Sequence, residues 1–217
     1  MSQTTDFNSL ERSLLAMARD RNRHFLAIVG APGSGKSTLA QALFEALEAQ
    51  LPGRSAILPM DGFHFDDMLL RERGDLPRKG APHTFDVGGL QAILGRLAAG
   101  DAPVAVPVFD RDLEIARAGA RIIAPEARLI LVEGNYLLLD DPDWAVLRPH
   151  FDKSVFLDVP FKTLRARLLT RWSSYPPEEA ERKISENDLP NARRVVEGSV
   201  PADLVLTDWQ PPQGGAA

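Results

Sequence analysis

The stretch Gly30-Ala31-Pro32-Gly33-Ser34-Gly35-Lys36-Ser37 decides the fold of this chain. It matches the pattern G-x-x-x-x-G-K-[ST], in which glycines permit a tight turn and consecutive backbone N–H groups point at phosphate oxygens. The dipole of a following helix adds positive potential at the same place. The pattern predicts a nucleotide-binding loop from Gly30 to Thr38, with Lys36 at the β- and γ-phosphates and Ser37 on Mg²⁺. We expect ATP as the nucleotide, with GTP as the alternative.

The residues on either side of this loop have the periodicities of a strand and a helix. Residues 24–29 form a short, mainly apolar run of strand length. After the loop, Pro52-Gly53 ends a helical pattern carried by Leu39, Leu43, Phe44, Leu47 and Leu51. A glycine-rich turn that binds nothing is the alternative, and this strand–loop–helix setting disfavours it.

Further apolar runs predict a three-layer α/β sandwich of the P-loop NTPase type. Residues 129–132 and 155–157 are continuous apolar runs, typical of strands covered on both faces, and residues 56–58 and 204–206 supply two more. Within residues 104–108, valines alternate with a small residue and a proline, which predicts an edge strand or an extended loop. Because strand and helix patterns alternate, we expect a doubly wound, mainly parallel, five-stranded sheet with a helical lid.

The chain of 217 residues fits one domain with a substantial core. We expect this domain to cover residues 1–210, with an N-terminal helical extension at 1–22 and a lid at about 172–187. The apolar stripe of the extension comprises Phe7, Leu10, Leu14 and Met17, and its role is expected to be structural. Residues 211–217 are expected to form a disordered tail.

The composition limits the classes of partner and chemistry. A formal net charge of −5 gives no electrostatic reason to expect nucleic acid or an anionic membrane. The absence of cysteine excludes disulfides, thiolate zinc sites and a Cys nucleophile. Charged residues precede the first apolar run, so we expect neither a signal peptide nor membrane insertion, and a cytoplasmic location. The expected partner is a small molecule, and a homodimer is a possible assembly.

Two acids follow predicted strands, and both therefore face the rim of the sheet that carries the phosphate loop. Glu133, at the end of the 129–132 run, is placed to hold Mg²⁺ directly or through water, or alternatively to cap the turn at Gly134-Asn135. Asp61 is placed to accept the hydrogen bond of a substrate hydroxyl and aim its oxygen at the γ-phosphorus. An Asx turn with Gly62 is the alternative for Asp61.

Arg167 and Arg171 are four residues apart in a helical pattern, so they share one face. Both would reach the triphosphate when a lid closes, and guanidinium groups suit the charge that spreads over a transferring phosphoryl group. A solvated helix face is the alternative, and Arg165, which lies off this stripe, fits it better.

Several segments between these positions resemble the uridine kinase, phosphoribulokinase and type I pantothenate kinase branch of P-loop kinases, and most closely the set labelled fructose-transport-system kinases. The resemblance covers most of the chain and implies that Asp61 contacts an acceptor hydroxyl. Phe109 stands where the family has a tyrosine, so the hydrogen bond of that phenol is lost. The segments are Met60-Asp61-Gly62-Phe63-His64, Arg78-Lys79-Gly80-Ala81-Pro82, Thr84-Phe85-Asp86, Pro107-Val108-Phe109-Asp110, Val132-Glu133-Gly134-Asn135-Tyr136, Asn187-Asp188-Leu189-Pro190-Asn191 and Ala202-Asp203-Leu204-Val205-Leu206.

The sequence thus predicts a Mg-ATP-dependent kinase that phosphorylates a hydroxyl of a small metabolite, foremost a sugar or sugar-like alcohol. Uridine and pantothenate are alternative acceptors. A regulatory GTPase should also carry an N-K-x-D motif, which this chain lacks. His64 and His83 are candidates to hydrogen-bond the acceptor, with a core or surface position as the alternative. The full set of expected acceptor residues is Asp61, Phe63, His64, Lys79, His83, Phe85, Phe109 and Arg111.

Overall fold

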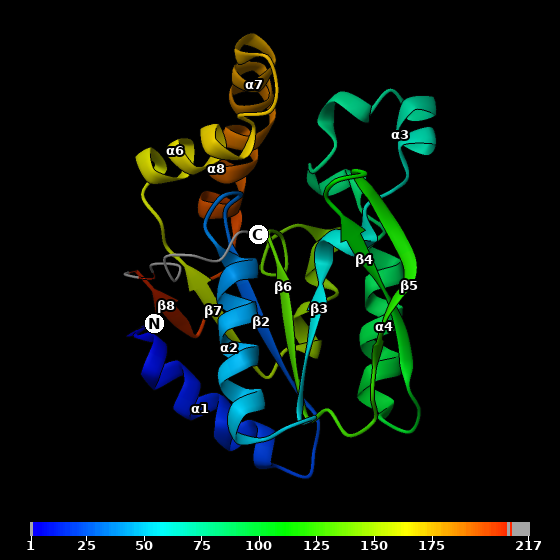
Figure 1. Ribbon diagram of the computed structural model, residues 1–217, viewed down its shortest axis with the longest axis vertical. Helices are drawn as coiled ribbons and strands as arrows, with labels where there is room; N and C mark the ends of the chain where they lie inside the picture. The colour runs from blue at the N-terminus through cyan, green and yellow to red at the C-terminus, as the bar shows by residue number, and fades with distance from the viewer. Residues whose placement is uncertain (1, 208, 210–217) are drawn as a thin grey trace.

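The computed structural model describes residues 2–207 and residue 209 (Figure 1). The tail predicted for residues 211–217 lies outside this part. In chain order the elements are β1 Gln3–Thr5, α1 Phe7–Arg19, β2 His24–Gly30, α2 Lys36–Gln50, β3 Ser55–Pro59, η1 Met60–Phe63, α3 Asp67–Arg73, η2 Leu76–Arg78, η3 Pro82–Thr84, α4 Val87–Ala99, β4 Val104–Asp110, β5 Ile115–Ile123, β6 Leu129–Gly134, α5 Pro142–Ala145, η4 Arg148–His150, β7 Lys153–Leu157, α6 Phe161–Arg171, α7 Pro177–Lys183, η5 Ile184–Asp188, α8 Leu189–Gly198 and β8 Leu204–Leu206.

The central sheet has the strand order β1-β8-β7-β2-β6-β3, and every pair in it is parallel. This confirms the predicted α/β, doubly wound fold, but the sheet has six strands rather than five. The additional strand is β1, in which Gln3 lies opposite Leu204. Its three residues, Gln-Thr-Thr, carry no apolar run, and the N-terminal extension predicted as helical therefore begins with a strand.

Strand β2 lies in the middle of the sheet and contributes to a core on each face. Phe25, Ala27 and Val29 pack with Leu90 and Leu94 of α4 on one side. Leu26 and Ile28 pack with residues of α1 and α2 on the other side. Successive side chains of a strand point to opposite faces, and a strand buried on both faces is apolar, as residues 25–30 of β2 are. The packing also confirms the predicted apolar stripe of α1, because Leu10 and Leu14 are fully buried.

Residues 104–108, expected to be an edge strand or extended loop, belong to β4, which is outside the central sheet. Strand β4 pairs with β5 in a separate antiparallel ribbon with a register shift between Val106 and Val108. The β5 strand was not predicted, because most of its residues are exposed and Gly119, at φ 64°, interrupts its pattern. A Cβ at Gly62 would lie 2.5 Å from the carbonyl oxygen of Pro107, so glycine allows the ribbon to approach η1 closely.

Two groups of helices extend beyond the carboxyl end of the sheet, where β2 gives way to the phosphate loop (Figure 1). One group consists of α6, α7, η5 and α8, and the other consists of α3 with the turns that follow it. The lid predicted at about 172–187 corresponds to the turn after α6, all of α7 and most of η5. Its role as a lid stays a prediction. Within the described residues, none of the helices is both long and apolar enough to span a lipid bilayer.

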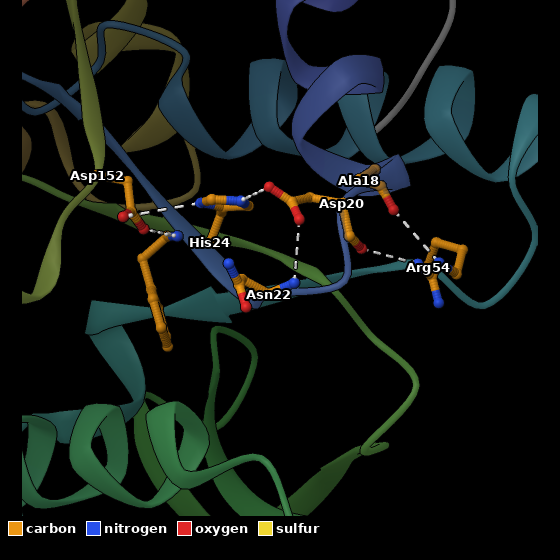
Figure 2. A network of polar contacts seen from close by, with 7 residues as sticks. Ala18, Asp20, Asn22, His24, Arg54 and Asp152 are labelled. Carbon is orange, nitrogen blue, oxygen red and sulfur yellow. Dashed lines mark hydrogen bonds and ion pairs between the residues drawn. The ribbon is translucent and has the colours of Figure 1, made fainter.

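The opposite end of the sheet is held by a polar network around His24 (Figure 2). His24 Nε2 lies 3.0 Å from Asp20 Oδ2, and its Nδ1 lies 3.7 Å from Asp152 Oδ1. Asp152 also accepts a 2.8 Å hydrogen bond from the backbone N–H of Phe25, and Arg54 donates to the carbonyl oxygen of Asp20. These contacts join the end of α1, the start of β2 and the segment before β7, away from the phosphate loop.

Candidate active site

The phosphate loop joins the end of β2 to the start of α2. Gly33 and Gly35 have φ angles of 79° and 95°, a conformation that favours glycine. Gly35 is the N-cap residue of α2. Because glycine has no side chain, the N–H groups of the first helical turn receive no hydrogen bond from a capping side chain. Ser34 is fully buried, and its Oγ has no hydrogen-bond partner among the described residues. Free N–H groups and an unpartnered buried hydroxyl fit a bound phosphate chain.

Lys36 begins α2, and its half-buried side chain places the ammonium group at the rim. Its Nζ donates to Asn135 Oδ1 at 2.5 Å and lies 3.5 Å from the carbonyl oxygen of Ala31. Burial lowers the pKa of Lys36, while the charges of Glu133 and Asp61 oppose that shift. Sequence reasoning missed Asn135 as the partner of this lysine. The available signal was its position directly after the strand that ends in Glu133 and Gly134.

Ser37 and Glu133, the two residues predicted to hold magnesium, lie next to each other beside Lys36. Ser37 Oγ lies 3.2 Å from Glu133 Oε2, and Glu133 is 5% exposed. Burial, followed by the negative charge of Asp61, raises the pKa of Glu133. A Cβ at Gly134 would lie 2.5 Å from Met60 Cβ, so glycine lets the ends of β6 and β3 approach.

This pair of oxygen donors fits Mg²⁺, which prefers hard oxygen ligands and usually keeps several waters. In the part of the chain that the structure describes, no group of three or more His, Cys, Asp or Glu side chains could enclose a metal. A magnesium ion here would therefore depend on Ser37, Glu133, phosphate oxygens and water. That arrangement is common when Mg²⁺ arrives with a nucleotide.

Asp61 lies in η1, directly after β3, on the same rim. Its Oδ2 forms a 3.0 Å ion pair with Arg111 Nη2. Burial opposes its ionisation, but His64, Arg111, Lys36 and Arg171 outweigh burial and hold the pKa of Asp61 below its ordinary value. A carboxylate that is ionised and partly exposed can accept a hydrogen bond from an incoming hydroxyl.

Aromatic contacts fix His64 beside Asp61. The His64 ring centroid lies 4.0 Å from that of Phe85 and 4.7 Å from that of Phe109. Its Nδ1 lies 2.7 Å from the carbonyl oxygen of Asp61. Burial lowers the pKa of His64, and the Asp61 charge only partly opposes this, so the imidazole is neutral at pH 7.

Lys79 ties three acceptor-side segments together. Its Nζ donates to Asp67 Oδ1 at 2.5 Å, donates to the carbonyl oxygen of Glu114 and lies 5.3 Å from the ring centroid of Phe109. Its side chain is 14% exposed. Because its charge is already paired, Lys79 acts here mainly as a brace between α3 and the β4–β5 ribbon.

Two of the expected acceptor residues, Phe63 and His83, lie elsewhere than at this rim, and a third, Phe85, reaches it as a core aromatic ring that packs against His64. Phe63 and Phe85 are 6% and 4% exposed and belong to the hydrophobic core, because large aromatic side chains gain most from burial. His83 is half exposed and lies 3.4 Å from Asp75. Among the described residues, no hydrogen bond or ion pair joins His83 to Asp61. The rim therefore brings together Asp61, His64, Lys79, Phe109 and Arg111 from the predicted acceptor set.

The two predicted lid arginines project from α6 and differ in surroundings. Arg167 Nη1 donates to the carbonyl oxygen of Ser34 at 2.8 Å and lies 3.4 Å from that of Gly33. Burial, followed by the charge of Arg111, lowers the pKa of Arg171, and Asp61 and Asp188 oppose this. Arg167 therefore contacts the phosphate loop, whereas the guanidinium of Arg171 lies 5.3 Å from the ring centroid of Trp172. As expected for a residue off this stripe, the side chain of Arg165 is 45% exposed, and it pairs with Glu181.

Relatives of this chain include several kinases. The protein YggC of Escherichia coli K12, which is uncharacterized, is 35% identical over 94% of this chain and 88% of its own length. A "putative uridine kinase" of Schizosaccharomyces pombe is 30% identical over 93% and 90%. The crystal structure of a "putative fructose transport system kinase" from Silicibacter sp. TM1040 has a TM-score of 0.85 and 44% identity, and covers 95% of this chain and 100% of its own.

No protein-family profile matches the chain. Family membership follows from the relatives above, which align over nearly their whole lengths, and from the phosphate loop, the strand-end acids and the helices beyond the sheet. These findings confirm the resemblance drawn from the sequence. The chain belongs to the uridine kinase-like branch of the P-loop kinases.

Proposed function

We propose that this kinase transfers the γ-phosphoryl group of Mg-ATP to a hydroxyl of a sugar or sugar-like alcohol. The observation that carries the proposal is the position of Asp61, an ionised carboxylate on the same rim as Lys36, Ser37 and Glu133. A protein that only binds or hydrolyses nucleotide has no need for a carboxylate on the far side of the phosphates. A hydroxyl kinase needs one there to orient the acceptor.

The chain's own residues divide the reaction between them. Asp61 accepts the hydrogen bond of the acceptor hydroxyl, holds its oxygen in line and takes its proton late. Lys36 and Arg171 supply positive charge where negative charge spreads during transfer. Ser37 and Glu133 would hold Mg²⁺, which would neutralise phosphate charge. Arg167, through the carbonyl oxygen of Ser34, keeps α6 against the phosphate loop.

The choice of a sugar rests on two kinds of support. His64 and Arg111 offer hydrogen-bonding groups beside Asp61, as a polyhydroxylated acceptor requires. The solved structure with 44% identity is described as a kinase of a fructose transport system. A nucleoside is the alternative acceptor, because the yeast relative at 30% identity is described as a uridine kinase.

The test is a panel of alcohols, including hexoses, sugar acids, uridine and pantothenate, assayed for acceptor-dependent ADP release with Mg-ATP. We expect one chemical class to stimulate release, and we expect the Asp61→Asn variant to lose that stimulation while it still binds ATP. If ADP release from the wild-type protein does not depend on any acceptor, the hydroxyl kinase assignment is wrong. Stimulation by uridine alone would mean that the acceptor is a nucleoside and not a sugar.

A further inference from the structure

A π-helical segment interrupts the helix that runs through α7 and α8. Segment η5, Ile184–Asp188, separates the two, and π-helical turns are frequent at functional sites. Pro190 lies just after it and has no N–H group, so it cannot donate to the carbonyl oxygen of Glu186 as an α-helix would require. The carbonyl oxygen of Glu186 is thereby available to a partner outside the helix.

That partner comes from the acceptor side of the site. Arg78 Nη1 donates to the carbonyl oxygen of Glu186 at 3.2 Å, and Asn187 Nδ2 donates to the carbonyl oxygen of Lys79 at 2.7 Å. These four residues form what we call the lid clasp. Asn191, which is 4% exposed, donates to Asn187 Oδ1 at 3.1 Å and so fixes the orientation of its amide.

Through Lys79, the clasp connects to the groups that surround the acceptor position. Lys79 contacts Asp67, the carbonyl oxygen of Glu114 and the ring of Phe109. The next residue, Gly80, accepts a 2.6 Å hydrogen bond from the hydroxyl of Tyr136, which lies just beyond β6. A displacement of the acceptor-side segments therefore moves the carbonyl oxygen to which Asn187 is bonded.

On its inner side, the same segment reaches the lid arginine. Asp188 follows Asn187 and accepts a 2.7 Å hydrogen bond from Trp172 Nε1. Trp172 is adjacent to Arg171, whose guanidinium lies 5.3 Å from the indole centroid, and Asp188 is one of the charges that act on Arg171. Segment η5 thus contacts the acceptor-side loop through Glu186 and Asn187, and the surroundings of Arg171 through Asp188.

We propose that Asn187 is a positioning residue that makes the placement of Arg171 depend on the acceptor-side loop. With the loop in place, the clasp holds η5, and Asp188 and Trp172 hold Arg171 toward the transferring phosphoryl group. Without the clasp, the helices of the lid stay folded, but their position relative to the acceptor is no longer fixed. This inference rests on the proposed function, and its consequence is that acceptor binding favours transfer over hydrolysis by water.

The experiment compares Asn187→Ala and Asn187→Asp with Ser185→Ala. Asn187→Asp keeps the volume but cannot donate to the carbonyl oxygen of Lys79. Ser185 lies in the same segment and bonds only the carbonyl oxygen of Glu181, so it is the matched control. Loss of one neutral hydrogen bond corresponds to a factor of roughly 2–12. We expect both Asn187 variants to lower kcat/KM for the acceptor by about that factor, with ATP dissociation constants unchanged.

A second readout is the ratio of acceptor-independent ADP release to phosphorylated product. We expect this ratio to rise in both Asn187 variants and to stay at the wild-type value in Ser185→Ala. If the Asn187 variants differ from wild type only in thermal unfolding temperature, the clasp is merely structural and the proposal is wrong. If wild-type protein phosphorylates no acceptor, the proposed function fails instead. An Asn187→Ala variant that transfers like wild type overturns the clasp alone.

Discussion

The nucleotide side and the acceptor side of the rim are built in different ways. On the nucleotide side, Lys36 and Ser37 lie within one continuous strand–loop–helix unit, and their partners Asn135 and Glu133 come from the neighbouring strand end. On the acceptor side, the side chains come from segments between residue 61 and residue 114, tied by ion pairs and by Lys79. A compact motif therefore determines nucleotide binding, whereas tertiary structure assembles the acceptor position.

The largest effect is expected from Lys36→Ala, which removes the lysine charge of the nucleotide side. Turnover should fall by about 10³-fold or more, because this ammonium meets charge that develops during transfer. The fold should persist, since the lysine contributes no apolar packing to either core. Turnover with the identified acceptor and circular dichroism on the same preparation check both statements, and normal turnover in a folded variant would contradict the assignment.

Asp61→Asn tests the acceptor side alone. Transfer should fall by roughly 10²–10⁴-fold, the span typical of a positioned acid–base group, while ATP affinity changes little. The control is Asp140→Asn, which also breaks an arginine pair, with Arg148 at 3.1 Å, at an exposed position. Titration with ATP and turnover at saturating acceptor separate the two sides. A loss confined to ATP affinity would move Asp61 to the nucleotide side.

The two predicted lid arginines should differ, because Arg167 already donates to the phosphate loop, whereas Arg171 is proposed to meet the transferring phosphoryl group. Arg171→Ala is expected to lower kcat by about 10²-fold, and Arg167→Ala by about tenfold, each with a smaller effect on ATP binding. Arg165→Ala, which breaks an exposed pair on the same helix, should be neutral. Steady-state kinetics on the three variants measure this order. Equal losses for Arg167 and Arg171 would mean that both contact the same phosphate.

The smallest effect concerns stability on the acceptor side. Burial holds the pKa of His64 below its ordinary value of 6.5, so the unfolded chain binds the proton more tightly than the folded one. The stability that comes from the neutral ring is complete above pH 6.5 and is lost as the pH falls toward the folded pKa. As the pH falls from about 8 to about 5, the urea midpoint of unfolding should therefore decline more steeply for wild type than for His64→Gln. Parallel curves would show that His64 is not protonated preferentially in the unfolded chain.

The sequence predicted the phosphate loop, its strand and helix, and the two strand-end acids, because each follows from neighbouring residues. The pairing of Lys36 with Asn135 was missed, since a position directly after a strand end is a weak signal and an asparagine there has many ordinary roles. His83 was assigned by its place in the predicted substrate loop and Phe85 by the resemblance of its segment, yet His83 lies at the surface and Phe85 in the core. The contact between Asn187 and Lys79 joins residues that no periodicity relates.

The strand order has a consequence for how this chain is made. Strand β2 emerges from the ribosome early, but its sheet partners β6 and β7 follow only after the acceptor-side segments. Strand β1 can pair only later still, because its partner β8 lies at the far end of the described chain. A nascent chain therefore carries an apolar, unpaired strand through much of translation, a condition that favours aggregation and chaperone capture. The loop that carries Lys36 and Ser37 is therefore translated well before Glu133 and Asn135, the residues that contact it from the neighbouring strand end.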